Sequence, residues 1–471
     1  MEHFDHWIGG GWQAPALGAY LDVATSPVTG ETLTPIARGS KSDIVAAVKS
    51  AQAVQAGWAS RPPSERGRIL SAVADAIRGR LTEFAEAEAA QTGKTTASRE
   101  VDLSAEYFTY YGATIRAFHG EVLGLGDGVT AYTKHEPIGV IGVITPWNAP
   151  LNQAARDVAP ALAAGNAVVL KPSEFTSFTS LMLAETAVAA GLPAGLLNVV
   201  TGTGSEAGAA LVQADGIGKV AFTGSVATGK LIGAAAGARL IPVTLELGGK
   251  SANIVFADAN LDRAAAHVAM GFTQNAGQVC SAPTRLVVHA DIHDSLVDRV
   301  AATVDGLQAG SQLGPMITAA QFDKVRSYFE IAKSEKATLR TGGSALCDEA
   351  EKGRYVRPTI FTDVRPNMRI AQEEIFGPVL SVLRFETEDE AIAIANGTEY
   401  GLAASVWTSD TGRALRVANQ LQAGQVSVNG AALGNEAPFG GYKSSGLGRV
   451  KGHEALLTYT QVKTIGISTV S

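Results

Sequence analysis

The sequence predicts an α/β fold with two domains and a small additional β element. Three observations predict it: the length of the chain, an alternation of short apolar runs with helix-like segments after residue 138, and a tail of alternating polarity. A chain of 471 residues is too long for one hydrophobic core. The hydrophobic fraction of 46% and the charged fraction of 18% are ordinary for a folded protein, so they favour no special class.

Two helical segments come first. Residues 43–59 carry apolar side chains at helical spacing, and we expect Asp43 to cap this helix. A single second helix is expected over residues 64–91, behind a pair of prolines. Residues 121–137 are rich in Gly and Thr and have no helical period, so they are expected to form a hairpin or loop.

From residue 138 onward, short apolar runs recur with helix-like segments between them. This order is typical of a parallel sheet with helices on its faces and right-handed crossovers, as in a Rossmann-like nucleotide-binding domain. Strands are expected at 138–144, 167–171, 196–202, 219–224 and 242–249, and helices at 150–164, 177–190, 204–213 and 226–236.

A second α/β region is expected at about 250–445. Its strands include residues 285–289 and 425–430. The tail, 456–468, alternates like a strand but has no obvious local partner. We therefore expect it to pair with another part of the fold or with another subunit.

Charge and cysteine content restrict the partners and the compartment. A net charge of -7 gives no reason to expect nucleic acid or an anionic membrane as a partner. Two cysteines exclude a disulfide framework and fit a reducing compartment. The N-terminal residues show no secretory signal, and the longest apolar runs are too short to span a bilayer. We expect a cytoplasmic protein without membrane contact.

Cys280 is the first side chain that can carry chemistry. A lone cysteine is usually a small buried hydrophobe. Cys280, however, lies among small and polar residues in NAGQVCSAPTR, where a thiol can be exposed and activated. No neighbouring His supports a Cys–His hydrolase. Cys347 lies in a loop-like segment that points to no chemistry.

Two polar residues stand at the carboxyl ends of expected strands, where open α/β sheets bind ligands. Glu246 is flanked by Leu245 and Leu247. Its side chain either points to solvent or acts as a general base whose pKa is raised by partial desolvation. Asn148 either caps the helix that begins at Pro150 or donates its amide to an oxyanion.

Two glycine-rich segments compete as the dinucleotide site. Gly202, Gly204 and Gly208 approach the G-x-G-x-x-G pattern, but the last spacing is one residue too long, so this match is weak. Gly224 and Ser225 lie between an expected strand and an expected helix, whose backbone N–H groups can hold a pyrophosphate.

Lys171 and Glu174 follow another expected strand. One interpretation is a solvated lysine with an acid that favours the helix dipole. The other is that both side chains bind ribose hydroxyls, where a carboxylate favours NAD and repels the 2′-phosphate of NADP.

Taken in order, these segments resemble the aldehyde dehydrogenase superfamily over nearly the full length of the chain. The spacing of Glu246 and Cys280 also matches the family pattern. Shared order over many motifs is hard to produce by chance. The matching segments are WIGGGW, PVTGE, PWN, KPSE, FTGS, LELGGK, GQVC, EEIFGPV and PFGGYKSSGLGR.

The resemblance implies a division of the chain into three parts. Residues 1–118 and 138–246 are expected to form an NAD(P)-binding domain, and residues 247–446 a catalytic domain. Residues 119–137 and 456–471 are expected to form a bridging or oligomerisation element, as in a homodimer or homotetramer.

The resemblance also implies a reaction. Cys280 attacks an aldehyde, and the Asn148 amide and the Cys280 backbone N–H stabilise the thiohemiacetal. Hydride transfer to NAD, with NADP as an open alternative, leaves a thioester. Glu246 then activates the water that hydrolyses it. No metal is expected.

The residues implied to contact the cofactor come from four segments. They are Lys171 and Glu174 at the adenosine ribose, Gly224 and Ser225 at the pyrophosphate, Glu374 at the nicotinamide ribose, Phe376 near the nicotinamide, and Trp147 lining the site.

The chain departs from the family pattern at two places. Pro283 replaces the commoner Gly of SAGTR and is expected to stiffen the loop that carries Cys280. Val450 replaces a Glu that is sometimes assigned a proton-relay role, which leaves Glu246 as the obvious base.

The substrate is expected to contact Gln153 and Arg156, which lie on one helix face. By resemblance, an Arg here suits a semialdehyde carboxylate or an aromatic aldehyde. Alternatively, Arg156 pairs with Asp157 or with a surface acid. We expect a polar or aromatic aldehyde. The nearest rival is a CoA-acylating semialdehyde dehydrogenase, against which Glu246 argues; a Cys-dependent hydrolase and a non-catalytic protein are further alternatives.

Overall fold

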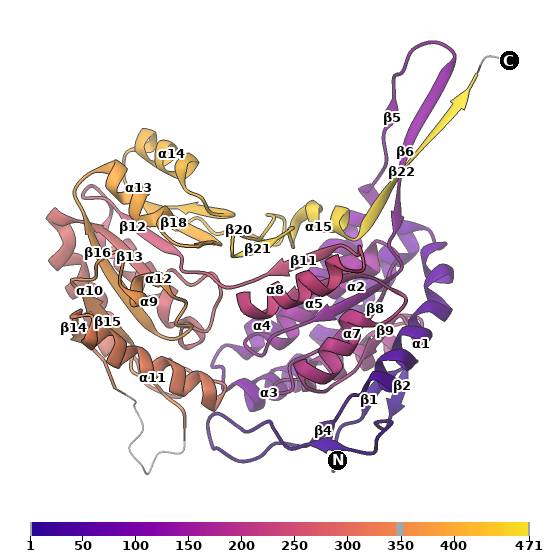
Figure 1. The fold of residues 1–471 in the computed structure, drawn as a ribbon, viewed down its shortest axis with the longest axis horizontal. Helices are drawn as coiled ribbons and strands as arrows, with labels where there is room; N and C mark the ends of the chain where they lie inside the picture. Colours follow the sequence, from indigo (N-terminus) through magenta and orange to yellow (C-terminus); the bar gives the residue numbers. More distant parts are fainter. Residues whose placement is uncertain (1, 345–352, 470–471) are drawn as a thin grey trace.

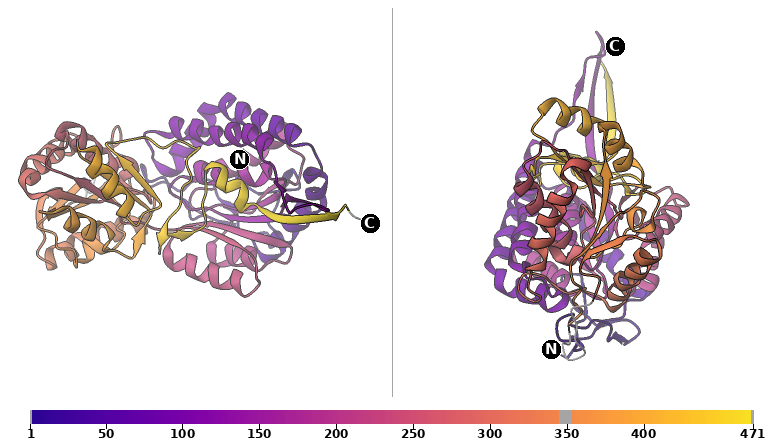
Figure 2. Two further views of the ribbon diagram at one scale, coloured as in Figure 1. Left: turned by 90° about the horizontal axis from the view of Figure 1, so that it is seen from above. Right: turned by 90° about the vertical axis from the view of Figure 1, so that its left-hand side faces the viewer.

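In the computed structural model, two α/β lobes lie side by side, and a β arm extends from one of them (Figures 1 and 2). The structure describes residues 2–344 and 353–469. The α/β fold class predicted from the sequence is confirmed. In the described part of the chain, no helix is long and apolar enough to cross a membrane.

The first lobe is built on a sheet of eight strands within the described residues. Its five central strands, β9, β8, β7, β10 and β11, are parallel. All five were predicted, and β7 and β8 are buried at every position because helices cover both faces. In spatial order the strands are β2 (Gly11–Gln13), β1 (His6–Ile8), β9 (Leu197–Val199), β8 (Ala167–Lys171), β7 (Val140–Ile144), β10 (Ile217–Thr223), β11 (Val243–Glu246) and β21 (Gly446–Leu447).

The predicted crossover helices are also present. The segment predicted over 204–213 begins as a π-helical turn, η2 (Gly204–Gly208), before it becomes α-helical. The helices are α5 (Pro150–Ala163), α6 (Phe178–Ala189), α7 (Ala209–Gln213) and α8 (Val226–Gly237).

The N-terminal helices differ from the prediction in two details. Helix α1 (Lys41–Ala59) is capped by Ser40, so the assignment of Asp43 as its cap is wrong. The Asp43 carboxylate instead accepts hydrogen bonds from the Ser40 backbone N–H at 2.8 Å and hydroxyl at 2.7 Å, which is the return half of a capping box.

The helix predicted over 64–91 is two helices, α2 (Pro63–Gly79) and α3 (Leu81–Thr92). The chain breaks at Arg80, whose φ of -111° and ψ of 23° are not helical. A glycine directly before the break weakens the helix there. Helix α4 (Ala97–Thr114) and a short 3-10 turn, η1 (Ile115–Ala117), complete this region.

The second lobe is built on a sheet of seven strands across the described ranges, parallel except for β14. In spatial order they are β14 (Thr338–Thr341), β15 (Thr359–Thr362), β16 (Val379–Phe385), β13 (Arg285–His289), β12 (Ala252–Val255), β18 (Ala403–Trp407) and β19 (Gln425–Val428). Its helical turns are α9 (Leu261–Thr273), η3 (Gln274–Gly277), η4 (Ala290–Ile292), α10 (His293–Asp305), α11 (Ala319–Ser334), α12 (Arg369–Gln372), α13 (Glu388–Asn396) and α14 (Thr411–Gln420).

The tail strand finds its partner within the same chain. Strand β22 (Thr460–Ser468) pairs antiparallel with β6 (Val129–Pro137), which also pairs with β5 (Val122–Leu123). These three strands form the arm at whose end the C-terminus lies (Figure 1). The prediction of a strand from residue 456 is wrong at its start, because helix α15 (Gly452–Thr458) continues to Thr458.

Two strand pairs are smaller. The pair β3 (Tyr20–Leu21) and β4 (Ile36–Ala37) lies near the N-terminus, and β17 (Tyr400–Gly401) pairs with β20 (Tyr442–Lys443). After β20 the chain adds β21 to the edge of the first sheet, antiparallel to β11. The last segment therefore returns to the first lobe, close to the end of β11 where Glu246 lies.

Candidate active site

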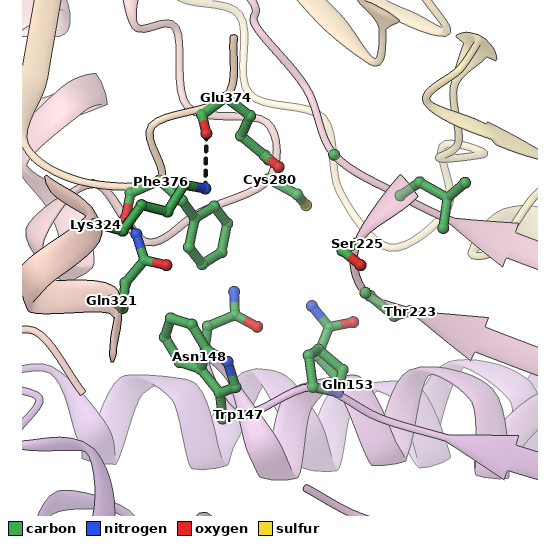
Figure 3. Close-up of a pocket in the computed structure, with 14 residues that line it drawn as sticks. Trp147, Asn148, Gln153, Thr223, Ser225, Cys280, Gln321, Lys324, Glu374 and Phe376 are labelled. Carbon is green, nitrogen blue, oxygen red and sulfur yellow. Dashed lines mark hydrogen bonds between the residues drawn. The ribbon is translucent and has the colours of Figure 1, made fainter. Parts of the chain in front are cut away.

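A cavity of about 190 Å³ lies where the two lobes meet (Figure 3). The first lobe contributes residues that follow β7, β10 and β11, and the second lobe contributes the Cys280 loop, helix α11 and the segment after α12. Most of the residues predicted for the site converge here. The cavity is lined by Pro146, Trp147, Asn148, Gln153, Thr223, Gly224, Ser225, Leu247, Gly248, Cys280, Gln321, Lys324, Glu374 and Phe376.

The loop that carries Cys280 has an unusual backbone. Asn275, Ala276 and Gly277 all have positive φ, at 50°, 52° and 72°. A Cβ at Gly277 would lie 2.2 Å from the carbonyl carbon of Gly377, so only glycine fits this approach. The close contact sets the Cys280 loop against the segment that carries Glu374 and Phe376.

Hydrogen bonds join this loop to the first lobe. The Asn148 amide donates to the Gln278 carbonyl at 2.9 Å, and the Asn275 amide donates to the Asn148 carbonyl at 3.0 Å. Helix α5 is capped by Ala149, so the alternative in which Asn148 only caps this helix does not hold. An amide NH₂ group has two hydrogens, and the bond to Gln278 leaves the other for a ligand in the cavity.

The Cys280 thiol lies at the cavity wall, only partly exposed. Burial raises its pKa to about 11, while the positive charge of Arg156 acts in the opposite direction. Glu246 and Glu374 act in the same direction as burial. Cys347 lies outside the described residues.

Glu246 ends strand β11 and is only 2% exposed, so its side chain does not point to solvent. Neither carboxylate oxygen has a hydrogen-bond partner among the described residues. Burial raises the pKa of Glu246 to about 8, against the lowering effect of Arg156. Glu246 does not line the cavity itself; it lies within electrostatic range of Cys280, beside Gly440. An unpaired buried carboxyl group with this pKa has the properties of a general base.

The two residues predicted to contact substrate separate in the structure. Gln153 lines the cavity, and its buried amide oxygen has no partner within the described ranges. Arg156 lies deeper, 4% exposed, and donates to the Thr223 hydroxyl at 2.8 Å. No described carboxylate oxygen lies within 4.0 Å of Arg156, so it forms no ion pair with Asp157 and is not a surface residue.

The second lobe adds an aromatic and acidic wall. The rings of Trp147 and Phe376 meet edge to face, with centroids 5.5 Å apart. Phe376 has a φ of 59°, a strained conformation for a bulky residue. The Glu374 carboxylate accepts a hydrogen bond from the Gly249 backbone N–H at 3.0 Å, and burial raises its pKa.

Two residues that support this wall were not found from the sequence. Gln321 on α11 donates to the carbonyls of Ile375 and Phe376 at 2.9 and 3.0 Å, and Lys324 donates to the Glu374 carbonyl at 2.9 Å. Both side chains line the cavity (Figure 3). Both residues lie on one helix at a spacing of three, which is the only sign of a shared role in the sequence. Nothing in the sequence connects α11 with the segment that carries Glu374 and Phe376.

A larger cavity of about 640 Å³ shares Trp147, Gly224 and Ser225 with the first. Lys171 and Glu174 line it, 3.3 Å apart between Nζ and Oε2. Lys171 is buried, which lowers its pKa, so it is not a solvated surface charge.

Both glycine-rich segments contribute to this larger cavity. Gly204 and Gly208 line it, and a Cβ at either position would meet no atom closer than 3.9 Å, so open space faces them. Ser225 caps helix α8, whose N-terminal N–H groups can bind an anion. Gly202 does not line the cavity but packs against Gly39. The volume and the charged, glycine-lined walls fit an extended dinucleotide.

Pro283 and Val450, the two departures from the family pattern, both lie in well-packed surroundings. The Pro283 ring lies over Gly271 of α9, where a Cβ would come within 2.7 Å of it. Val450 is 2% exposed and exchanges backbone hydrogen bonds of 2.7 and 2.8 Å with Phe439. Together with Leu402 these two form a small apolar cluster against Cys280.

The chain is similar to known proteins over nearly its whole length. A sequence model of the aldehyde dehydrogenase family matches residues 17–465. Acetaldehyde dehydrogenase 2 of Cupriavidus necator is 43% identical over 99% of this chain and 95% of its own length. A betaine aldehyde dehydrogenase of Brucella anthropi is 45% identical over 98% of this chain and 96% of its own. The NAD⁺ complex of an aldehyde dehydrogenase from Bacillus cereus superposes with a TM-score of 0.97, at 38% identity over 100% of this chain and 97% of its own.

Proposed function

The chain belongs to the aldehyde dehydrogenase family, and from this premise we propose that it oxidises an aldehyde to the carboxylic acid with NAD⁺. The observation that carries the proposal is the convergence of Cys280 and Asn148 on one cavity, with the buried carboxyl group of Glu246 beside it. Relatives that were solved with NAD⁺ support the choice of cofactor.

In the proposed reaction, Cys280 is the nucleophile. Its thiol gives its proton to water, and a bond forms between Sγ and the aldehyde carbon as the carbonyl π bond opens to an oxyanion. The free amide hydrogen of Asn148 and the Cys280 backbone N–H stabilise the negative charge on the aldehyde oxygen. A nicotinamide held between Trp147 and Phe376 would accept the hydride, and the acyl group would then remain on Cys280 as a thioester.

Glu246 acts in the second half of the proposed reaction. As a carboxylate it removes a proton from water, and the hydroxide adds to the thioester carbon. The C–S bond then breaks, the acid leaves, and the released Cys280 thiolate takes up the proton that Glu246 removed from water. The desolvated site of Glu246 raises its basicity for this task.

The cofactor is proposed to extend through both cavities. Lys171 and Glu174 bind the adenosine ribose, Gly224 and Ser225 the pyrophosphate, and Glu374 the nicotinamide ribose. Phe376 and Trp147 are proposed to flank the nicotinamide, consistent with their edge-to-face contact. The Glu174 carboxylate favours NAD over NADP.

Each lobe is proposed to have its own function. We propose residues 1–118 and 138–246 as the cofactor-binding domain and 247–446 as the catalytic domain. The arm, with residues 119–137 and 456–471, is proposed to bridge subunits of a homodimer or homotetramer. Strand β22 supports this, since it is an outer strand of its sheet in the described part of the chain and exposes Val462 and Ile467. A cytoplasmic location is proposed from the cysteine content.

Gln153 supports a polar or aromatic aldehyde as substrate, because its amide oxygen has no partner among the described residues and can accept a hydrogen bond. The rival is a CoA-acylating enzyme, in which coenzyme A takes the place of water. A CoA-acylating enzyme does not need a general base to activate water. The position of Glu246 beside Cys280 therefore argues against the CoA-acylating alternative.

The test is a product analysis. Purified protein is incubated with NAD⁺ and an aldehyde panel, with and without coenzyme A, while NADH is followed at 340 nm. The expected product is free acid in both cases, and Cys280→Ala abolishes NADH formation. Acyl-CoA as the main product would establish the rival, and no NADH with any aldehyde would reject the proposed function.

A further inference from the structure

Lys451 places an ammonium group beside two aromatic rings near the site. Its Nζ lies 5.6 Å from the ring centroid of Phe439 and 5.9 Å from that of Tyr107. Both distances are in the range of cation–π contacts. Lys451 has a φ of 61°, which is a strained backbone conformation for a residue other than glycine.

This ammonium group has no polar partner among residues 2–344 and 353–469. Within the described part of the chain, Lys451 donates no side-chain hydrogen bond and lies within 4.0 Å of no carboxylate oxygen. A second cation, Arg156, has its Cζ 5.8 Å from the centroid of the same Phe439 ring. Phe439 is thus flanked by two positive groups, and it belongs to the apolar cluster that packs against Cys280.

A second cation and three acidic groups act on the pKa of Lys451. Burial and the positive charge of Arg156 lower the pKa of Lys451 to about 8, against the raising effect of Cys280, Glu246 and Glu436. Cys280 is a neutral thiol at pH 7, because burial raises its pKa to about 11. A carboxylate close to Lys451 and Arg156 gains two charge-assisted interactions in a partly desolvated place.

We propose that Lys451 is a specificity-determining residue that binds an anionic group at the far end of the aldehyde, so that the preferred substrate is a short ω-oxo acid. The proposal rests on the proposed function and narrows its substrate class.

The same arrangement disfavours a cationic aldehyde. Aromatic faces are the usual recognition surface for a quaternary ammonium group. Here the faces of Tyr107 and Phe439 already hold the protein's own ammonium group, and a trimethylammonium substrate would add a third positive charge beside Arg156. Relatives 43–45% identical are named betaine aldehyde dehydrogenases; we expect this chain to differ from them in substrate.

The experiment compares three aldehydes of similar size: succinic semialdehyde, butanal and betaine aldehyde. The wild-type enzyme is expected to have the highest kcat/KM for succinic semialdehyde. Lys451→Met, which keeps the length but removes the charge, is expected to lower this value by about 10- to 100-fold, mainly through KM. For butanal the change is expected to stay within about twofold, and Lys451→Arg is expected to restore much of the loss.

Lys333→Met is the matched control, because Lys333 is exposed near the C-terminal end of α11 and does not line the cavity. The proposal is overturned if Lys451→Met lowers kcat/KM equally for succinic semialdehyde and butanal, or if the wild type prefers butanal or betaine aldehyde. If Lys451→Met fails to fold, the kcat/KM values of the wild type for the three aldehydes still test the proposal. Absence of NADH with all three aldehydes rejects the proposed function instead.

The pH dependence gives a second readout. The KM for succinic semialdehyde is expected to rise as the pH passes about 8, where Lys451 loses its proton. Arg156, Glu246, Glu436 and Cys280 face the same region, and their titration acts on butanal as well. A rise in KM of equal size for both aldehydes would therefore contradict a specific role of Lys451.

Discussion

The side-chain amide of Asn148 donates a hydrogen bond of 2.9 Å to the backbone carbonyl of Gln278, two residues before Cys280. Asn148 follows strand β7 of the first lobe, whereas Gln278 belongs to the second. The Gln278 side chain is itself fixed, because it donates to the carbonyls of Asn275 and Pro315 and accepts from the Ile317 N–H. One amide therefore both locates the nucleophile loop and presents a free N–H to the cavity.

Replacement of Asn148 tests this double role. Asn148→Ala removes the proposed oxyanion donor and is expected to lower kcat by about 100- to 1,000-fold. Asn148→Asp places a carboxylate against the Gln278 carbonyl and is expected to be at least as impaired. Stopped-flow measurement of the NADH burst isolates the first half-reaction. Asn419→Ala, on the surface of α14, serves as a control; a full burst amplitude and rate in Asn148→Ala would contradict the role.

Glu246 is expected to control the second half-reaction. Because the carboxylate is the active form and burial raises the pKa of Glu246 to about 8, the rate of thioester hydrolysis should rise as the pH increases through 8. Glu246→Gln should keep the NADH burst but lose this pH-dependent turnover. A Glu246→Gln enzyme with the wild-type pH profile would assign the base to another group.

The same burial predicts a stability effect of defined sign. The pKa of Glu246 is raised from 4.5 to about 8, so the protonated form is favoured in the folded state. Its contribution to stability is fully present below pH 4.5 and is lost as the pH rises through 8. Glu246→Gln, which stays neutral, is therefore expected to have a higher Tm than the wild type at pH 9. The difference should shrink toward pH 5, as scanning calorimetry can show.

The sequence predicts those parts of the fold that depend on local pattern. The central strands of the first sheet are apolar runs bounded by turns, and burial on both faces requires that composition. The ends of elements depend on geometry instead. Arg80 interrupts a continuous helical pattern, and Leu456 belongs to α15 although it lies in an alternating stretch.

In the candidate site, too, the sequence predicts the residues that lie in local patterns but not those whose role depends on three-dimensional packing. Cys280 and Asn148 could be named because they lie in recognisable segments at strand ends. Gln321 and Lys324 could not, since their role depends on α11 meeting a segment about fifty positions away in the sequence. Lys451 was also missed: on its own, a lysine at a helix start predicts a solvated charge, and only the packing of Tyr107 and Phe439 around it indicates otherwise.

The Cys280 thiol is expected to be unreactive at neutral pH in the free enzyme. Burial raises its pKa to about 11, so alkylation by iodoacetamide should accelerate about tenfold per pH unit between pH 7 and 9. Arg156→Met removes the main group that lowers this pKa and should slow alkylation further, while Arg156→Lys should not. The measurement uses a Cys347→Ser background, in which Cys280 is the only thiol. A rate independent of pH would indicate a preformed thiolate and contradict the assignment.

Glu174 is expected to set the choice between cofactors. Glu174→Gln removes the negative charge but keeps the size, and it leaves Lys171 free to attract a 2′-phosphate. The ratio of kcat/KM for NADP to that for NAD should rise by about tenfold, or about 1.4 kcal/mol. Glu330→Gln, on the exposed face of α11, is the matched control. An unchanged ratio would place the ribose elsewhere.

Gly277 is expected to tolerate no side chain. Its φ is 72°, and a Cβ there would lie 2.2 Å from the carbonyl of Gly377. Gly277→Ala must therefore either strain the left-handed turn, at a cost of about 1–3 kcal/mol, or move the two segments apart. Separation shifts Cys280 relative to Phe376 and Glu374, and a displacement of that kind costs about 100-fold in rate.

The expected result for Gly277→Ala is thus a lower Tm together with a lower kcat. Gly57→Ala is the matched glycine control, because Gly57 lies in helix α1 with nothing within 4 Å of a Cβ. Alanine has a higher helix propensity than glycine, so Gly57→Ala should leave the stability unchanged or raise it slightly. If Gly277→Ala keeps both Tm and kcat, the contact with Gly377 does not position the nucleophile, and the hydrogen bond from Asn148 to Gln278 must hold the loop by itself.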